Sequence, residues 1–209
     1  MKRRLFSILL TLALCLGLMP MTAIPVHAAS YDLWIAGVRV TDENKGNLSV
    51  INGVDVAAGG KASFDPVSNI LTLENATITS SVTNAIDVSS SITEFKIVFA
   101  GANRISAQVS TGYCRGINAL NSTLILSGED DANLTIQANM SGDSEENGAI
   151  RVGALNITGG TVFVECPLDQ YGPSHNPYCI SLNNSKGTTL TVSGGKLISK
   201  GWEPLFYGP

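Results

Sequence analysis

Four short stretches of the chain share one pattern: Asn84-Ala85-Ile86-Asp87-Val88, Arg115-Gly116-Ile117-Asn118-Ala119, Gly148-Ala149-Ile150-Arg151-Val152 and Tyr178-Cys179-Ile180-Ser181-Leu182. In each stretch a small residue precedes an isoleucine, and a polar and then an apolar residue follow it. The isoleucines recur about every thirty residues, and a repeat of this length is typical of solenoid proteins. This recurrence decides the fold prediction.

Two further short apolar segments follow each of these stretches. In the second repeat they are Leu124-Ile125-Leu126 and Leu134-Thr135-Ile136, and Ser127-Gly128 marks the junction between them. Alternate residues of a strand point to opposite faces, so the leucine and isoleucine of Leu-Thr-Ile can enter a core while threonine faces water. Three such segments per repeat predict an all-β fold, a right-handed parallel β-helix with three strands per turn of about 31 residues.

An antiparallel β-sandwich is the competing all-β interpretation. A sandwich also has short strands at intervals of about 8–12 residues, but it gives no reason for a repeat at thirty. We therefore expect residues 79–200 to form the β-helix repeats. Residues 30–78 read as two hairpins, with the small, loop-like segment 53–60 between them, and predict an N-terminal β-hairpin cap with a first partial turn. Residues 201–209 are expected to be a C-terminal tail or a truncated cap.

The first 29 residues have the order of a secretory signal peptide. Basic residues at positions 2–4 precede an apolar run over 5–19, and small residues follow near Ala28 and Ala29. The run is shorter than the roughly 20 apolar residues that span a bilayer, so a retained membrane anchor is the weaker interpretation. Cleavage after Ala29 predicts a secreted, extracellular protein, with attachment to the cell surface left open.

Charge and composition narrow the classes of partner. The whole chain has a net charge of −4, and removal of residues 1–29 takes away basic residues but no acidic ones. An acidic chain without a cluster of lysine and arginine lacks the electrostatic footprint for nucleic acid or anionic lipid. We therefore expect no nucleic-acid partner, no membrane contact after processing, and a monomer.

Three cysteines remain after processing, which allows one pair and one leftover thiol. Cys166 and Cys179 bracket a proline-containing segment without a strand pattern, so a disulfide between them is one interpretation. It would stabilise the fold by roughly 3 kcal/mol through loop closure. The alternative is that Cys166 and Cys179 are two buried thiols, and the state of Cys114 is left open.

The outward positions of the first strand are one candidate site for carbohydrate. In consecutive repeats these positions hold Asp87, Asn118, Arg151 and Ser181. Their side chains would lie on the same face at intervals of about 4.8 Å, the spacing of neighbouring strands. Such a row suits hydrogen bonding to sugar hydroxyls, but it contains no pair of carboxylates like that of glycoside hydrolases. A solvated strand face is the alternative.

Two other groups of residues are further candidates. Tyr113, Tyr171 and Tyr178 lie in segments that precede first strands. Their aromatic rings offer flat faces on which a sugar can stack. Three carboxylates, Asp143, Glu145 and Glu146, lie within four residues and are the candidates for binding calcium, which prefers hard oxygen ligands. Packing of loops and solvated turns are the alternative interpretations of these two groups.

The segments Tyr31-Asp32-Leu33-Trp34-Ile35-Ala36-Gly37-Val38-Arg39-Val40-Thr41 and Leu71-Thr72-Leu73-Glu74-Asn75-Ala76-Thr77-Ile78 carry a family resemblance. They resemble the opening of secreted surface proteins of Gram-positive bacteria, in which a β-helical, carbohydrate-binding region follows. The resemblance covers the cap closely and the repeats loosely, and it carries over no functional residue. It implies extracellular carbohydrate binding or surface display, with calcium as a candidate ligand.

Three functions follow as hypotheses. The first is a non-catalytic, extracellular carbohydrate-binding or adhesin-like module. The second is a pectin-active lyase or hydrolase of the β-helix type, for which the sequence offers no catalytic set. The third is a structural display rod with no ligand of its own.

Overall fold

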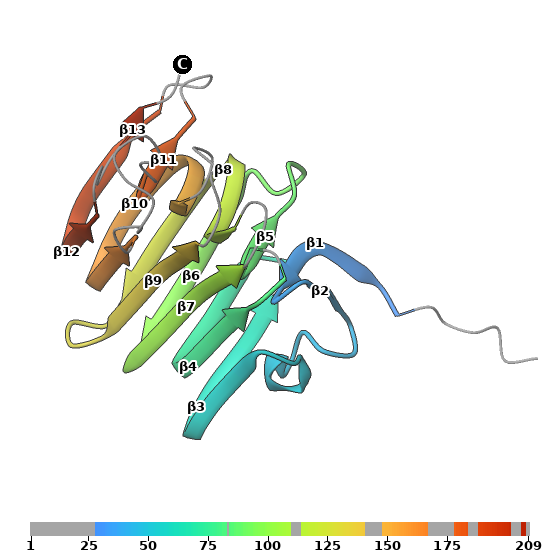
Figure 1. Ribbon diagram of the computed structural model, residues 1–209. Coiled ribbons are helices and arrows are strands. Elements are labelled where there is room, and N and C mark those ends of the chain that lie inside the picture. Colours follow the sequence, from blue (N-terminus) through green and yellow to red (C-terminus); the bar gives the residue numbers. More distant parts are fainter. Residues whose placement is uncertain are drawn as a thin grey trace, which may run out of the picture.

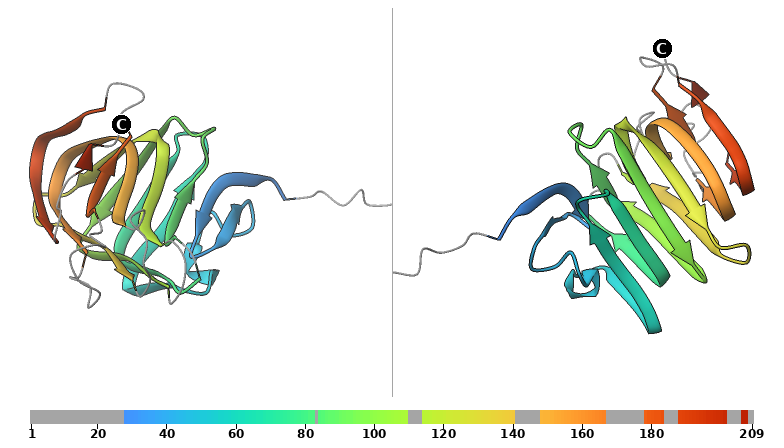
Figure 2. Two further views of the ribbon diagram at one scale, coloured as in Figure 1. Left: turned by 45° about the horizontal axis from the view of Figure 1, so that its top comes forward. Right: turned by 180° about the vertical axis from the view of Figure 1, so that it is seen from behind.

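The computed structural model describes residues 28–82, 84–109, 114–140, 148–166, 178–183, 188–201 and 206–207, which form a parallel β-solenoid (Figure 1). Parallel strands stack side by side along the solenoid, with the N-terminal cap at one end and β11–β13 at the other (Figures 1 and 2). The elements are β1 (Ser30–Ile35), β2 (Val38–Thr41), the 3-10 helix η1 (Leu48–Val50), β3 (Val54–Asp65), β4 (Ile70–Ser80), β5 (Ile86–Val88), β6 (Glu94–Ala100), β7 (Ala102–Val109), β8 (Arg115–Gly128), β9 (Asn133–Met140), β10 (Gly148–Glu165), β11 (Ile180–Leu182), β12 (Leu190–Lys200) and β13 (Phe206–Tyr207).

The isoleucines that define the repeat form a single column. Ile86 pairs with Ile117, Ile117 with Ile150, and Ile150 with Ile180, each in parallel register. All four side chains are buried. The predicted stacking of repeats is therefore confirmed: each turn covers the apolar inner wall of the next.

The other two sides of the solenoid have their own core columns. On the second side the column continues through β4, β6, β8, β10 and β12, and on the third side through β4, β7, β9 and β10. Strands β4, β8, β10 and β12 run through the corners and serve more than one side. The buried columns are Leu71, Ile97, Leu126 and Ile157 on the second side, where the paired Val192 of the last turn is exposed, and Ile78, Ile105, Ile136 and Val164 on the third.

One corner of the solenoid is filled by the ring of Phe99, which is fully buried. A Cβ placed on Gly128 would lie 2.3 Å from that ring, and one on Gly160 would lie 2.6 Å from it. Gly160 also has a φ of +71°, a conformation that L side chains rarely adopt. The glycines at this corner are therefore required because one aromatic ring occupies the side-chain space of the two turns that follow it.

The N-terminal cap closes the first turns with antiparallel strands. The hairpin of β1 and β2 turns at Ala36 and Gly37, both with positive φ, and β1 then pairs antiparallel with β5. The ring of Tyr31 meets Phe64 edge-on at 6.0 Å between centroids, and Phe64 lies 6.4 Å from Phe95 of the core. The cap thus pairs with the first side through its backbone and joins the core through its aromatic rings.

The second predicted hairpin also forms, but the expected loop over residues 53–60 is wrong. β3 is one strand of 12 residues that pairs antiparallel with β4, and its register shifts between Val56 and Lys61. The small residues in this segment form the irregularity where the register shifts, because hydrogen bonds from β4 hold the backbone extended on both sides. Tertiary pairing thus overrides the local preference for a loop.

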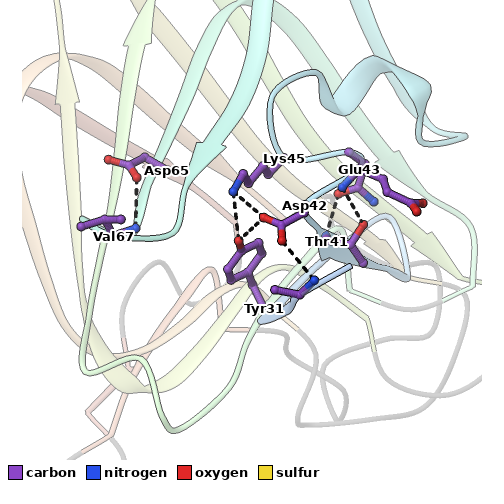
Figure 3. Close-up of polar contacts among 9 residues, drawn as sticks. Tyr31, Thr41, Asp42, Glu43, Lys45, Asp65 and Val67 are labelled. Atoms are coloured by element: carbon purple, nitrogen blue, oxygen red, sulfur yellow. Dashed lines mark hydrogen bonds and ion pairs between the residues drawn. The ribbon is translucent and has the colours of Figure 1, made fainter. Parts of the chain in front are cut away.

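A polar cluster ties the start of β1 to the turn after β2 (Figure 3). Asp42 accepts hydrogen bonds from the Nζ of Lys45 and from the hydroxyl of Tyr31, both at 2.5 Å. The Nζ of Lys45 also donates to the Tyr31 hydroxyl at 3.0 Å. The bonds from Lys45 and Tyr31 lower the pKa of Asp42 from 3.8 to about 2.

This cluster predicts a dependence of stability on acid. Because the pKa of Asp42 is lower in the folded state, its contribution is complete above about pH 4 and is lost as the pH falls toward 2. We expect Asp42→Asn to flatten the fall in melting temperature between pH 4 and pH 2, measured by circular dichroism. Glu43→Gln is the control, because the described hydrogen bond of Glu43 is made by its backbone. Parallel curves for the wild type and Asp42→Asn would contradict the assignment.

Candidate polysaccharide-binding face

The outward residues of the first side form a straight row. Asp87 pairs with Asn118, Asn118 with Arg151, and Arg151 with Ser181, in the same registers that stack the isoleucines. All four side chains are half-buried, and each lies between two buried residues of its own strand. We call Asp87, Asn118, Arg151 and Ser181 the polar row. The structure therefore brings together three predicted site residues, Asp87, Asn118 and Arg151.

The first two members of the polar row are hydrogen-bonded to each other. The Nδ2 atom of Asn118 donates to Oδ1 of Asp87 at 2.7 Å. This bond fixes the orientation of the Asn118 amide, because its Nδ2 faces the Asp87 carboxylate and its Oδ1 is directed away from it. The row thus combines a carboxylate, an oriented amide, a guanidinium and a hydroxyl along the axis of the solenoid.

The structure extends this row with an aromatic residue that the sequence did not indicate. Trp34 of β1 pairs with Asp87 of β5, so its half-buried indole follows the polar row at the cap end. The guanidinium carbon of Arg39 lies 5.2 Å from the centroid of the Trp34 ring. Because β1 joins the sheet from outside the repeat, no periodicity in the sequence could place Trp34 here.

Arg39 is itself held in place beside the indole. It forms an ion pair with Asp32 at 2.8 Å and donates to the backbone carbonyl of Tyr31 at 2.9 Å. Asp32 also accepts a hydrogen bond from Ser91 at 2.6 Å. The hydrogen bond from Ser91 and the charge of Arg39 lower the pKa of Asp32. Trp34 is therefore backed by a cation whose position is fixed by neighbours.

The remaining predicted site residues are not gathered at this row by the structure. Tyr178 is half-buried and lies two residues before the first residue of β11 and three residues before Ser181. Tyr113 and Tyr171 lie outside the described residues, as do the calcium candidates Asp143, Glu145 and Glu146. Within the described ranges, no group of three or more histidine, cysteine or acidic side chains is arranged to hold a metal ion.

The three cysteines in the described part of the chain, Cys114, Cys166 and Cys179, are buried thiols. Cys166 ends the third side of one turn and Cys179 precedes β11, and a hydrogen bond between the two side chains brings them into contact. That hydrogen bond and burial raise the pKa of Cys166, whereas the same bond lowers the pKa of Cys179. The structure brings the two side chains close to each other with both as free thiols, and the disulfide between them stays a prediction.

A second polar chain lies on the third side of the solenoid. Arg104 donates to Gln137, and Gln137 donates to Glu165, across three successive turns. Phe163, a half-buried aromatic residue, stands in the outward row beside this chain. This face supplies matched controls, because it carries an arginine and an aromatic ring on the same scaffold.

A pocket of about 410 Å³ lies in the cap and not at the polar row. It is lined by residues of the segment after β2 and of β3, including Asn47, Ser49 and Lys61. None of the residues predicted to bind carbohydrate lines it. Over the described ranges, no helix has the length and hydropathy needed to cross a membrane.

Together these features define a parallel β-solenoid with a polar row that ends in an aromatic side chain. No protein-family model matches the chain, and neither a curated protein nor a solved structure matches it.

Proposed function

We propose that this protein is a non-catalytic, extracellular carbohydrate-binding or adhesin-like surface module, and that its ligand is a linear polysaccharide or cell-surface glycan. The observation that carries the proposal is the alignment of Trp34 with Asp87, Asn118 and Arg151 in one row. The family resemblance of the cap supports the same class of function.

The chemistry of the row suits a sugar polymer. Carboxylate and amide oxygens accept hydrogen bonds from hydroxyl groups, and a guanidinium donates to hydroxyl or carboxylate oxygens. A flat indole offers an apolar face to the C–H groups of a pyranose ring. Because the groups repeat at about 4.8 Å along a straight axis, an extended chain can contact several of them at once.

Binding to a glycan array tests the proposal, followed by titration of the best ligand with and without a chelator. We expect Trp34→Ala to weaken binding about tenfold, which corresponds to about 1.4 kcal/mol, because tryptophan is enriched among the few interface residues whose truncation costs more than 1 kcal/mol. Arg151→Ala is expected to weaken binding to acidic glycans most.

Two matched controls separate the face from the residue type. Phe163→Ala removes an outward aromatic ring, and Arg104→Ala removes an outward arginine, both from the third side. We expect both to leave affinity unchanged. Equal losses in Trp34→Ala and Phe163→Ala would mean that the polar row is not the site. No retention on any glycan would favour a display rod, and release of unsaturated or reducing ends from pectate would favour an enzyme.

A further inference from the structure

The backbone of Ala29 is bound on both sides by one residue. Its N–H donates to Oδ2 of Asp42 at 3.1 Å, and its carbonyl accepts from the backbone N–H of Asp42 at 2.9 Å. The next residue, Ser30, pairs with Thr41 as the first rung of the β1–β2 hairpin. Ala29 is therefore an integral part of the cap, although the sequence places it next to the leader.

The two oxygens of Asp42 have different partners. Oδ1 accepts from Tyr31 and Lys45, whereas Oδ2 is directed at the nitrogen of Ala29. An amide N–H is a neutral donor, and a charged donor makes a shorter and stronger hydrogen bond to a carboxylate. The nitrogen of Ala29 would become such a donor if it were the first atom of the mature chain.

The sequence allows a cut at this position. A signal peptidase requires small residues one and three positions before the bond that it hydrolyses. For the Ala28–Ala29 bond these are Ala28 and Val26, whereas a cut after Ala29 would place His27 three positions before the bond. The cut after Ala29 would also remove both contacts that Asp42 makes with Ala29.

We propose that a signal peptidase hydrolyses the Ala28–Ala29 bond, and that the new α-ammonium group of Ala29 forms an ion pair with Asp42 that completes the cap. This inference rests on the export assumed under the proposed function. Water supplies a hydroxyl group to the carbonyl carbon of Ala28 and a proton to the nitrogen of Ala29. The amine then takes up a further proton, because its ordinary pKa is about 7.7–8.0.

The charges around the new amine set its titration. Asp42 faces it directly, while Lys45 and Tyr31 approach the other carboxylate oxygen from the turn after β2 and from β1. The contact with Asp42 raises the pKa of the amine, and the more distant Lys45 opposes this. A raised pKa means that the ion pair stabilises the cap fully below about pH 7.7 and is lost as the pH rises through the folded value.

The first experiment identifies the mature N-terminus. The full chain is expressed in a Gram-positive secretion host, and the exported protein is analysed by intact mass and N-terminal sequencing. We expect the mature chain to begin at Ala29. A mature chain that begins at Ser30 or elsewhere would overturn the proposal while leaving export intact. An uncleaved chain retained in the cell would instead contradict export itself.

The second experiment tests the ion pair in the mature protein. The pKa of the α-amine is measured by NMR in the wild type, in Asp42→Asn and in Glu43→Gln. We expect a value above 8 in the wild type and in Glu43→Gln, and a fall to the ordinary range in Asp42→Asn. Equal pKa values in all three proteins would overturn the ion pair.

A third experiment tests the ion pair through the melting temperature and needs no substitution. The melting temperature of the chain that begins at Ala29 is compared with that of the chain that begins at Ser30, at pH 6.5. We expect the longer chain to melt higher by about 1–3 °C, which corresponds to an exposed ion pair in a domain of this size. Acetylation of the α-amine should remove part of this gain, and no difference between the two chains would overturn the proposal.

Discussion

Phe99→Ala is expected to lower the free energy of unfolding by about 3–5 kcal/mol, the range observed when a fully buried phenylalanine is truncated. The ring of Phe99 fills the corner space above both Gly128 and Gly160, so its loss leaves a cavity beside two residues that have no side chain to fill it. Urea unfolding at neutral pH measures the change. A loss below 1 kcal/mol would mean that the corner collapses without cost.

A double-mutant cycle sharpens this test. Gly128→Ala places a Cβ 2.3 Å from the Phe99 ring, and such overpacking costs about 1–3 kcal/mol. In the Phe99→Ala background the new methyl group meets an empty space, so the combined loss is expected to be smaller than the sum of the single losses. Gly46→Ala is the control, because Gly46, like Gly128, does not have positive φ and a Cβ there meets no atom within 4 Å. Additive losses would contradict the shared corner.

Protein purified from an oxidising medium is expected to contain a disulfide between Cys166 and Cys179 and to be about 3 kcal/mol more stable than the reduced form. The physical reason is that the bond closes the chain between the end of one turn and the start of the next, which restricts the unfolded state. The two side chains already lie close to each other inside the fold, so the bond would join neighbours of the folded state.

Alkylation before and after reduction, read by mass spectrometry under denaturing conditions, checks this prediction. One reactive thiol before reduction and three after it are expected in the mature protein. Cys114→Ser should keep the dependence of stability on reductant, whereas Cys166→Ser and Cys179→Ser should abolish it. Three reactive thiols before reduction would contradict the disulfide.

The core of the fold could be predicted because its cause is local and periodic. Ile117 and the isoleucines at the equivalent positions of the other repeats occur once per repeat. In a parallel solenoid, equivalent positions of successive repeats stack on one another. The cap was harder. The strand over Val54–Asp65 contains glycine and alanine where a loop would be expected, and only its antiparallel pairing with β4 makes it extended.

The candidate site divides in the same way. Asp87, Asn118 and Arg151 occupy equivalent positions of the repeat, so their alignment followed from the sequence. Trp34 reaches the same row through an antiparallel strand outside the repeat, and no spacing in the sequence reports that pairing. The proximity of Asp42 to Ala29 escaped prediction for the same reason, since it depends on the path of the turn after β2.

The corner filled by Phe99 limits how this architecture can grow. Along that corner the chain places Leu73, Phe99, Gly128, Gly160 and Gly195 in succession. A duplicated copy of the unit that carries Gly128 or Gly160 would find the space it needs on either side. A duplicated copy of the unit that carries Phe99 would place two phenylalanine rings next to each other at a corner whose glycines leave space for one ring. Lengthening of the array, by evolution or by design, is therefore restricted to the glycine-bearing units and has a direction along the chain.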